Sequence, residues 1–326
     1  MRRREFIAGL GGAAATWPVA ARAQQGTMPI IGFLYPAGRD TSGDVVAAFN
    51  EGLAAAGYHS GKNVTIEYRW GDRQADRLPG LVAELVAKKV SLIVANSAVA
   101  ALATKAATST IPIVFLTSDD PVRLGLVASV NRPGANLTGV NFLGNEVGTK
   151  RLDLLRELAP TAKRLGLLLN PGSPPSAGAL PLMRSAAEKL GYHVDVQHLQ
   201  SERDVQSAFA ALTAWKADAA IVLTDQLVRS LRAPLAQHAS RHGIPTIYPV
   251  RDFVVSGGLV SYGSDLSEAY RQVGNYTARI LKGERPAELP VVQSAKFELV
   301  VNLKAAKAIG LVVPEAFLIR ADEVIE

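Results

Sequence analysis

The sequence predicts an α/β protein with two doubly wound, parallel-sheet lobes joined by hinge crossings. Short apolar runs alternate with helical segments of about 10–15 residues, which is the pattern of βαβ units. This alternation restarts near residue 142, and a chain of 326 residues is long enough for two domains of ordinary size. No long Pro/Gly/Ser-rich linker separates the halves, so we expect short crossings between the lobes.

The first half of the chain predicts a parallel sheet flanked by helices. Apolar runs predict strands over residues 29–35, 64–70, 91–95, 113–116 and 137–142. Helices are predicted between them over residues 44–56, 76–89 and 98–107. Gly57 follows the first helix and is a typical helix end.

The second half repeats the same architecture. Strands are predicted over residues 164–169, 193–198, 219–223, 246–248, 259–262 and 297–301. Helices are predicted over residues 149–158, 180–190, 228–242 and 266–281, and a further helix begins at Ser201 with Asp204 completing a capping box. We expect the first lobe to comprise residues 28–141 with about 265–290, and the second about 142–264 with 291–326, with the ligand cleft between them.

Residues 1–23 predict an export signal peptide that is removed from the mature protein. Arg2, Arg3 and Arg4 precede an uncharged stretch, residues 7–21, and residues 21–23 form a small-x-small cleavage site. The stretch is shorter than the roughly 20 residues that a membrane-spanning helix needs. The Arg3-Arg4-x-Phe-Ile arrangement resembles a twin-arginine signal, and a general secretory signal is the alternative. We therefore predict a soluble protein of the periplasm.

Composition and motifs argue against several function classes. The absence of cysteine excludes disulfides, thiolate metal sites and lipid attachment. Half of the net charge of +6 lies in residues 1–23, and the remainder is too weakly basic to predict nucleic-acid binding. His238 and His242 have a spacing that can bind zinc, but Ala239 stands where a metalloprotease has its glutamate, which favours a solvated helix face. We predict no enzyme activity, no cofactor and no metal site.

Polar and turn residues follow the carboxyl ends of most predicted strands. Ligands of open parallel sheets bind at this edge, where helix N-termini offer free N–H groups to an anion. The alternative is that these residues only cap helices, which is as plausible for Ser97 and Ser118 as a ligand contact. The candidate ligand-binding residues are Tyr35, Asn96, Ser97, Thr117, Ser118, Asp119, Asn170, Asp225, Tyr248 and Tyr262.

Short segments spread over nearly the whole chain after residue 27 carry a family resemblance. In order they are NVTIEYRW (63–70), IPIVF (111–115), GLVAS (125–129), NRPGANLTGV (131–140), GGLVSYG (257–263) and KFELVVNLK (296–304). The sequence thereby resembles the tryptophan/tyrosine-type ABC transporter substrate-binding proteins, which have the type I periplasmic binding protein fold. The resemblance implies two lobes with three hinge crossings that close on a small solute, as in a Venus flytrap.

The resemblance also implies partners and site roles. It implies a monomer that delivers an amino acid, or a related aromatic or carboxylate compound, to a membrane permease and its ATPase. Ser97 and residues 117–119 would hold the ligand's carboxylate, and Asp225 its ammonium group. Tyr35, Tyr248 or Tyr262 would pack against the ligand. A periplasmic sensor that presents its solute to a receptor is an alternative, and an exported α/β enzyme is another.

Two neighbouring acids complicate this assignment. Asp119 and Asp120 stand beside the expected carboxylate site, and like charges in a dry cleft oppose an anion. At least one of them is therefore expected to point away or to be protonated.

Overall fold

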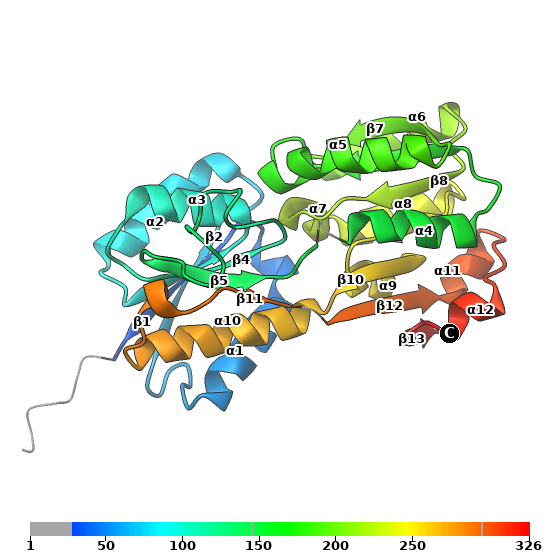
Figure 1. The fold of residues 1–326 in the computed structure, drawn as a ribbon. Helices are drawn as coiled ribbons and strands as arrows, with labels where there is room; N and C mark the ends of the chain where they lie inside the picture. Colours follow the sequence, from blue (N-terminus) through cyan, green and yellow to red (C-terminus); the bar gives the residue numbers. More distant parts are fainter. Residues whose placement is uncertain (1–27, 145–146, 295) are drawn as a thin grey trace, which may run out of the picture.

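The computed structural model describes residues 28–144, 147–294 and 296–326, so the predicted export signal lies outside the described residues. The chain forms two α/β lobes that lie side by side (Figure 1), each built around one sheet. The predicted fold class, two doubly wound lobes joined by hinge crossings, is confirmed.

The first lobe contains a six-stranded parallel sheet with the order β11-β5-β4-β3-β1-β2. Its strands are β1 (Ile30–Tyr35), β2 (Thr65–Trp70), β3 (Leu92–Asn96), β4 (Ile113–Thr117), β5 (Leu137–Asn141) and β11 (Val292–Gln293). Its helices are α1 (Gly43–Ala55), α2 (Leu78–Ala87), α3 (Ala98–Ala107) and α10 (Leu266–Leu281). Helices α1 and α10 pack together, as do α2 and α3, and each pair contributes to a separate hydrophobic core of this lobe.

The second lobe contains a seven-stranded sheet with the order β13-β12-β10-β9-β8-β6-β7. Its strands are β6 (Arg164–Leu169), β7 (His193–His198), β8 (Ala219–Val222), β9 (Thr246–Tyr248), β10 (Val260–Ser264), β12 (Phe297–Asn302) and β13 (Glu323–Ile325). Its helices are α4 (Gly148–Leu158), α5 (Pro174–Lys189), α6 (Glu202–Ala214), α7 (Gln226–Ser230), α8 (Arg232–Arg241), α9 (Arg251–Val255), α11 (Leu303–Ala308) and α12 (Glu315–Leu318). Two further hydrophobic cores lie in this lobe.

Close packing of α1 on α10 joins segments far apart in the sequence. A Cβ atom at Gly52 of α1 would lie 2.1 Å from the Arg271 carbonyl oxygen, and one at Gly274 of α10 would lie 2.3 Å from the Phe49 carbonyl oxygen. Only glycine permits this approach of the two backbones. Helix α10 is thereby fixed to the first lobe, although it follows β10 of the second lobe in the chain.

The chain crosses between the lobes three times, after β5, after β10 and after β11. The last crossing enters the second lobe at the carboxyl end of β10, where Phe297 pairs with Ser264. Strand β12 therefore runs antiparallel to β10, which the prediction of parallel sheets did not include. Because β11 pairs with β5, the first sheet also extends beyond the expected boundary near residue 290.

Two predicted helices differ from the structure. The segment 228–242 forms two helices, because Pro234 lacks an N–H group and fits only in the first turn of a new helix, α8. Helix α5 begins at Pro174 rather than near residue 180, and it contains Pro181. The short elements α9, α11, α12, β11 and β13 were not predicted, since they are too brief to show a periodic pattern.

Candidate functional site

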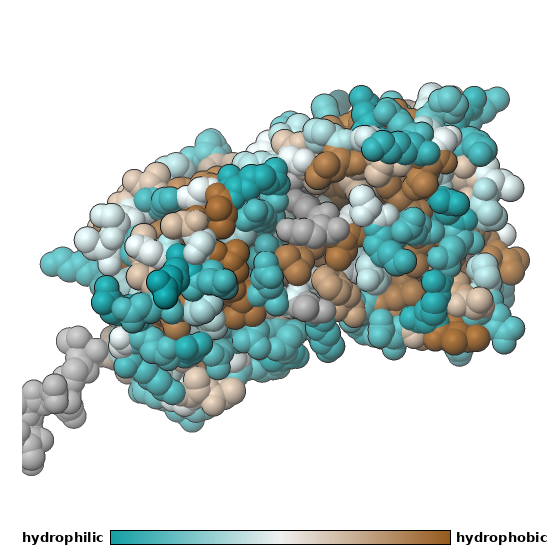
Figure 2. All heavy atoms as spheres, viewed as in Figure 1, coloured by the Kyte–Doolittle hydropathy of each residue, from teal (hydrophilic) through white to brown (hydrophobic). Residues whose placement is uncertain are grey.

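A cavity lies between the carboxyl ends of the two sheets and is lined by both lobes. The space inside the cavity and in its open mouth together amounts to about 560 Å³. On the face shown in Figure 2, hydrophilic residues predominate on both lobes, with hydrophobic residues scattered among them. The arrangement matches the edge at which open parallel sheets bind ligands.

The first-lobe wall of the cavity is suited to an anion. Ser97 caps α3, and its hydroxyl accepts a hydrogen bond from the Ala100 backbone N–H over 3.1 Å. The first N–H groups of α3 have no partner inside the helix, and they lie at the positive end of the helix dipole. Thr117 and Ser118, at the end of β4, line the same cavity and are buried. A carboxylate would find N–H donors and hydroxyls on this wall.

Asn96 precedes Ser97 on the same wall and is only 1% exposed. Its Nδ2 atom donates to the Leu34 carbonyl oxygen over 2.8 Å. Its Oδ1 atom is buried and has no hydrogen-bond partner among the described residues. Buried polar atoms are nearly always paired, so this acceptor is an exception that needs an explanation.

The second-lobe wall presents a carboxylate. Asp225 caps α7: its Oδ1 atom accepts from the Val228 backbone N–H over 3.0 Å and from Asn170 Nδ2 over 3.2 Å. Removal from bulk water raises the pKa of Asp225, and its hydrogen bonds oppose the shift only in part. A cationic group in the cavity would favour the ionised form. Thr224 and Ser173 lie on the same wall.

The rest of the lining is largely apolar. It includes Leu116, Phe142, Pro249, Val250, Phe253 and Leu266. Phe142 belongs to the crossing after β5, and Leu266 begins α10, so the apolar surface lies beside two of the three crossings. This surface can enclose a hydrophobic side chain, while the polar walls hold charged groups.

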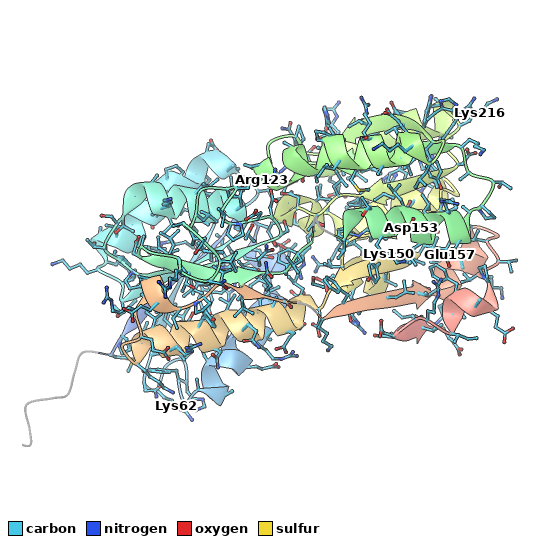
Figure 3. The ribbon with its side chains drawn as sticks, viewed as in Figure 1. Lys62, Arg123, Lys150, Asp153, Glu157 and Lys216 are labelled. Atoms are coloured by element: carbon cyan, nitrogen blue, oxygen red, sulfur yellow. The ribbon has the colours of Figure 1, made fainter. Side chains whose placement is uncertain are left out.

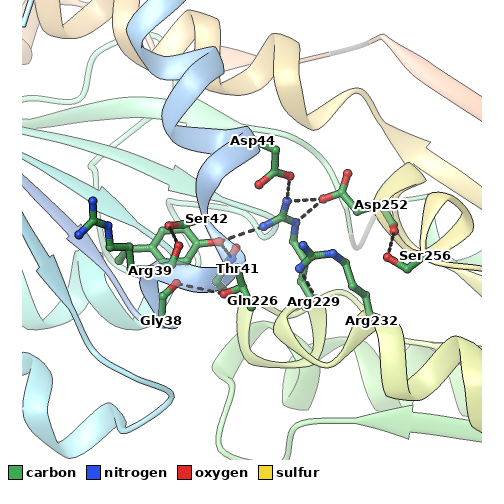
Figure 4. A network of polar contacts seen from close by, with 11 residues as sticks. Gly38, Arg39, Thr41, Ser42, Asp44, Gln226, Arg229, Arg232, Asp252 and Ser256 are labelled. Atoms are coloured by element: carbon green, nitrogen blue, oxygen red, sulfur yellow. Dashed lines mark hydrogen bonds and ion pairs between the residues drawn. The ribbon is translucent and has the colours of Figure 1, made fainter.

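Helix α7 also connects the two lobes directly. Its Arg229 is 4% exposed and donates from Nη1 to the Tyr35 hydroxyl of β1 over 2.9 Å. The same guanidinium forms ion pairs with Asp44 of α1 and Asp252 of α9, and Gln226 donates to the Tyr35 hydroxyl (Figure 4). We call Tyr35, Asp44, Gln226, Arg229 and Asp252 the interlobe network.

Neighbouring groups of the interlobe network keep the Arg229 guanidinium charged. Burial alone would lower the pKa of Arg229, but Tyr35, Asp252 and Asp44 outweigh it and raise this pKa above its ordinary value. Burial also raises the pKa of the Tyr35 hydroxyl. The guanidinium therefore stays charged and Tyr35 stays neutral. At the far end of α7, Arg73 Nε of the first lobe donates to Ser230 Oγ over 2.8 Å, a further bond between the lobes.

The ABC transporter substrate binding protein family matches residues 31–325, almost the whole described chain. The chain belongs to this family. The predicted family resemblance is thus confirmed.

Relatives of this substrate-binding protein include named binders of aromatic amino acids. A tyrosine-binding protein of Clostridioides difficile strain R20291 is 28% identical over 264 residues, which are 81% of this chain and 75% of that protein. The ABC domain of Streptococcus pneumoniae, solved in complex with L-Trp, is 25% identical with a TM-score of 0.82, covering 92% of this chain and all of that one.

Comparison with two further solved structures bears on lobe closure. A conserved domain protein of Vibrio cholerae O1 biovar El Tor is 28% identical with a TM-score of 0.85, covering 91% of this chain and all of that one. The ligand-free, open structure of a Clostridium difficile substrate binding protein is 26% identical, covers 91% of this chain and 99% of that one, and has a TM-score of only 0.64. At nearly equal identity, the structure of this chain is more similar overall to the L-Trp complex than to the ligand-free, open structure.

The structure brings five of the ten predicted ligand residues to the cavity of this substrate-binding protein. These are Asn96, Ser97, Thr117, Ser118 and Asp225. Tyr35 and Asn170 do not line the cavity but contact residues that do: Tyr35 bonds to Arg229, and Asn170, which lines a neighbouring groove, bonds to Asp225. Their roles in ligand binding stay predictions.

The other three predicted residues lie away from the cavity lining. Asp119 is ion-paired with Arg123, and both line a separate groove beside α5, near which Figure 3 labels Arg123. Asp120 lines that groove too, so neither acid faces the expected carboxylate site. The Tyr248 ring stacks on Phe253 inside the second lobe. The Tyr262 ring stacks on Phe297.

Arg229, Phe142 and Phe253 are among the cavity residues that the sequence analysis missed, for different reasons. Arg229 lies one helical turn beyond Asp225, so a survey of residues directly after strands does not reach it. The signal available in the sequence was the spacing of Asp225 and Arg229, which lie four residues apart shortly after the end of a strand. Phe142 was predicted as the end of a strand, and Phe253 belongs to α9, which was not predicted; only polar and turn residues after strands were candidates.

The structure offers no alternative metal or membrane site within its described part. Over residues 28–144, 147–294 and 296–326, no group of three or more His, Asp or Glu side chains is placed to hold a metal ion. The His238 and His242 rings both stack with Phe209, at centroid distances of 6.2 and 6.1 Å. No helix among the same residues has the length and apolar character needed to span a membrane.

Proposed function

We propose that this protein captures an amino acid, or a related aromatic or carboxylate compound, between its lobes. The observation that carries the proposal is the opposite polarity of the two cavity walls. The first lobe offers the N-terminus of α3 and several hydroxyls, and the second offers the Asp225 carboxylate. Arg229 also lines the cavity, but its guanidinium is ion-paired with Asp44 and Asp252. A zwitterion presents a carboxylate to one wall and an ammonium group to the other.

The apolar lining supports an aromatic or branched side chain on the ligand. Phe142 comes from the crossing after β5 and Phe253 from α9 of the second lobe, so apolar side chains from two separate segments would enclose the ligand. Relatives named for tyrosine binding and solved with L-Trp make aromatic amino acids the first ligands to test.

We further propose that the protein is the periplasmic component of an ABC importer. Its export signal would send a monomer to the periplasm, where it would carry the solute to a permease and its ATPase in the inner membrane. Ligand binding would favour the closed arrangement, and the permease would recognise closure rather than the ligand. A carrier of this kind releases its ligand chemically unchanged.

Thermal unfolding with a solute library tests the proposal. A ligand present at about 100 times its Kd should stabilise the protein by roughly 2.7 kcal/mol. Aromatic and branched L-amino acids are expected to raise the Tm, whereas indole, which lacks both charged groups, should not. If every amino acid leaves the Tm unchanged while another solute class raises it, the amino-acid assignment is wrong. Recovery of an altered solute after incubation would point to an enzyme.

A further inference from the structure

We infer that Asn96 is the first-lobe acceptor for the ligand's ammonium group, which is then bound by both lobes at once. The inference rests on the proposed amino-acid function and names a residue that decides specificity within it. It starts from the buried Oδ1 atom of Asn96, which has no partner among the described residues and belongs to a side chain that lines the cavity.

The orientation of the Asn96 carboxamide follows from its chemistry. The Leu34 carbonyl oxygen can only accept a hydrogen bond, so the atom 2.8 Å from it must be the Nδ2 donor. The remaining Oδ1 atom is therefore an acceptor and needs an N–H or O–H donor. A ligand carboxylate has no hydrogen to give, so the carboxylate cannot be its partner.

The position of Asn96 next to the α3 N-terminus selects the ammonium group. Ser97 is the cap of α3, whose free N–H groups suit the ligand's carboxylate. In an α-amino acid, the ammonium nitrogen is bonded to the carbon that carries the carboxylate. A carboxylate held at α3 thus places N–H donors close to the residue before the cap, which is Asn96.

The ammonium group has enough hydrogens for both walls. Its three N–H bonds can serve Asn96 Oδ1 of the first lobe and Asp225 of the second. A compound without the amino group leaves both acceptors unpaired when the lobes close. A site that hydrogen-bonds an N–H group of its ligand discriminates strongly against analogues without that group, because its buried acceptors are then left unpaired. A hydrophobic pocket discriminates much less between ligands of similar shape.

A pair of ligands and a pair of variants test this inference. The ligands are L-tryptophan and indole-3-propionate, which lacks only the amino group; L-tyrosine and 3-(4-hydroxyphenyl)propionate replace them if L-tyrosine is the better ligand. The variants are Asn96→Leu and, as the control, Asn136→Leu. Asn136 also donates from Nδ2 to a backbone carbonyl, that of Ile111 over 2.7 Å, and does not line the cavity. Affinities are measured by calorimetry for the amino acid and by competition for its analogue.

Asn96→Leu is expected to weaken amino-acid binding by about 10- to 100-fold and binding of the analogue by less than threefold. The ratio of the affinity for the amino acid to the affinity for its analogue should therefore fall in Asn96→Leu. In Asn136→Leu this ratio should stay within twofold of the wild-type value. Equal losses for both ligands would overturn the inference, because Asn96 would then act only through its bond to Leu34. An unchanged affinity for the amino acid would overturn it too.

A wild-type measurement keeps the inference testable if Asn96→Leu does not fold. In a crystal structure of the complex, the ammonium nitrogen should lie about 2.7–3.2 Å from Asn96 Oδ1. A water molecule on Oδ1 with the ammonium group elsewhere would contradict the inference and leave the proposed function intact. If no amino acid binds wild-type protein at all, the proposed function itself fails.

Discussion

The Arg229 guanidinium of the second lobe donates a hydrogen bond to the Tyr35 hydroxyl of the first lobe over 2.9 Å. Arg229 lies on the short helix α7, and the residue that caps this helix is Asp225 in the cavity wall. The short helix α7 and its cap therefore place a carboxylate of the cavity wall next to contacts between the lobes. Under the proposed function, α7 would link ligand binding to lobe closure.

Removing the Tyr35 hydroxyl is expected to favour the open arrangement. In Tyr35→Phe, Arg229 and Gln226 of the second lobe lose the first-lobe hydroxyl that accepts hydrogen bonds from both. Part of the binding free energy is the free energy of closure, so ligand affinity should fall by about two- to tenfold. Tyr276→Phe is the matched control, since this hydroxyl donates to the Pro290 carbonyl over 2.8 Å within the first lobe. Equal affinity in the two variants would show that the interlobe bond does not support closure.

Replacing the Asp225 carboxylate is expected to separate binding from stability. Asp225→Asn keeps the Oδ1 acceptor that caps α7 but removes the negative charge. Amino-acid affinity should fall at least tenfold, because the ammonium group loses its counter-ion. Calorimetry on the folded variant measures this loss, and retention of wild-type affinity would mean that the ammonium group binds elsewhere.

The raised pKa of Asp225 gives the same variant a pH signature. The folded state holds a proton on this carboxyl more tightly than the unfolded state does, so the ionised carboxylate destabilises ligand-free protein as the pH rises through this pKa. Ligand-free Asp225→Asn should then be at least as stable as wild type at pH 7, and the difference should shrink toward low pH. Urea unfolding at several pH values measures it. If the variant is clearly less stable than wild type at pH 7, the ionised Asp225 carboxylate does not destabilise the ligand-free protein, and the prediction is wrong.

Arg151 is expected to be a major contributor to the stability of the crossing region. This buried side chain of α4 donates from Nε to the Tyr262 carbonyl over 2.7 Å and from Nη2 to the Gly144 carbonyl over 3.1 Å. Burial lowers its pKa to about 10, which still leaves it charged at neutral pH. Arg151→Met should lower the free energy of unfolding by about 2–4 kcal/mol, because buried carbonyls lose their donor. Arg156→Met, at an exposed position of the same helix, should change it by less than about 0.5 kcal/mol in urea unfolding.

The N-terminal segment gives a prediction that is independent of the fold. If residues 1–23 are a twin-arginine signal, replacing Arg3 and Arg4 together by lysine should abolish accumulation of the protein in the periplasm. Cell fractionation and immunoblotting measure this accumulation. Undiminished export of the double variant would indicate the general secretory route instead.

The fold was largely predictable because its signals are local. Helices α3 and α10 have the bounds that their periodic patterns predict, since their buried faces recur at helical spacing. The antiparallel direction of β12 was not predictable in this way. It depends on where the chain re-enters the second lobe, which is a tertiary property and leaves no periodic trace in Phe297–Asn302.

The candidate site was predictable only in part, from residues at or just after the carboxyl ends of strands. Ser97, Ser118 and Asp225 occupy such positions and line the cavity. Tyr248 and Tyr262 lie within strands, where neighbouring side chains point to opposite faces, so one strand residue can face the core as readily as the cleft. The contacts of the interlobe network that join the two lobes link residues far apart in the sequence, such as Asp44 and Arg229, which are 185 positions apart, and no local pattern indicates them.

Titration of the purified protein with aromatic L-amino acids, followed by both calorimetry and small-angle scattering, tests the central claim most directly. The account predicts saturable binding of one amino acid per chain, together with a smaller radius of gyration as the lobes close. Amino acids that neither bind nor change the radius of gyration, alongside a different class of solute that does both, would contradict it.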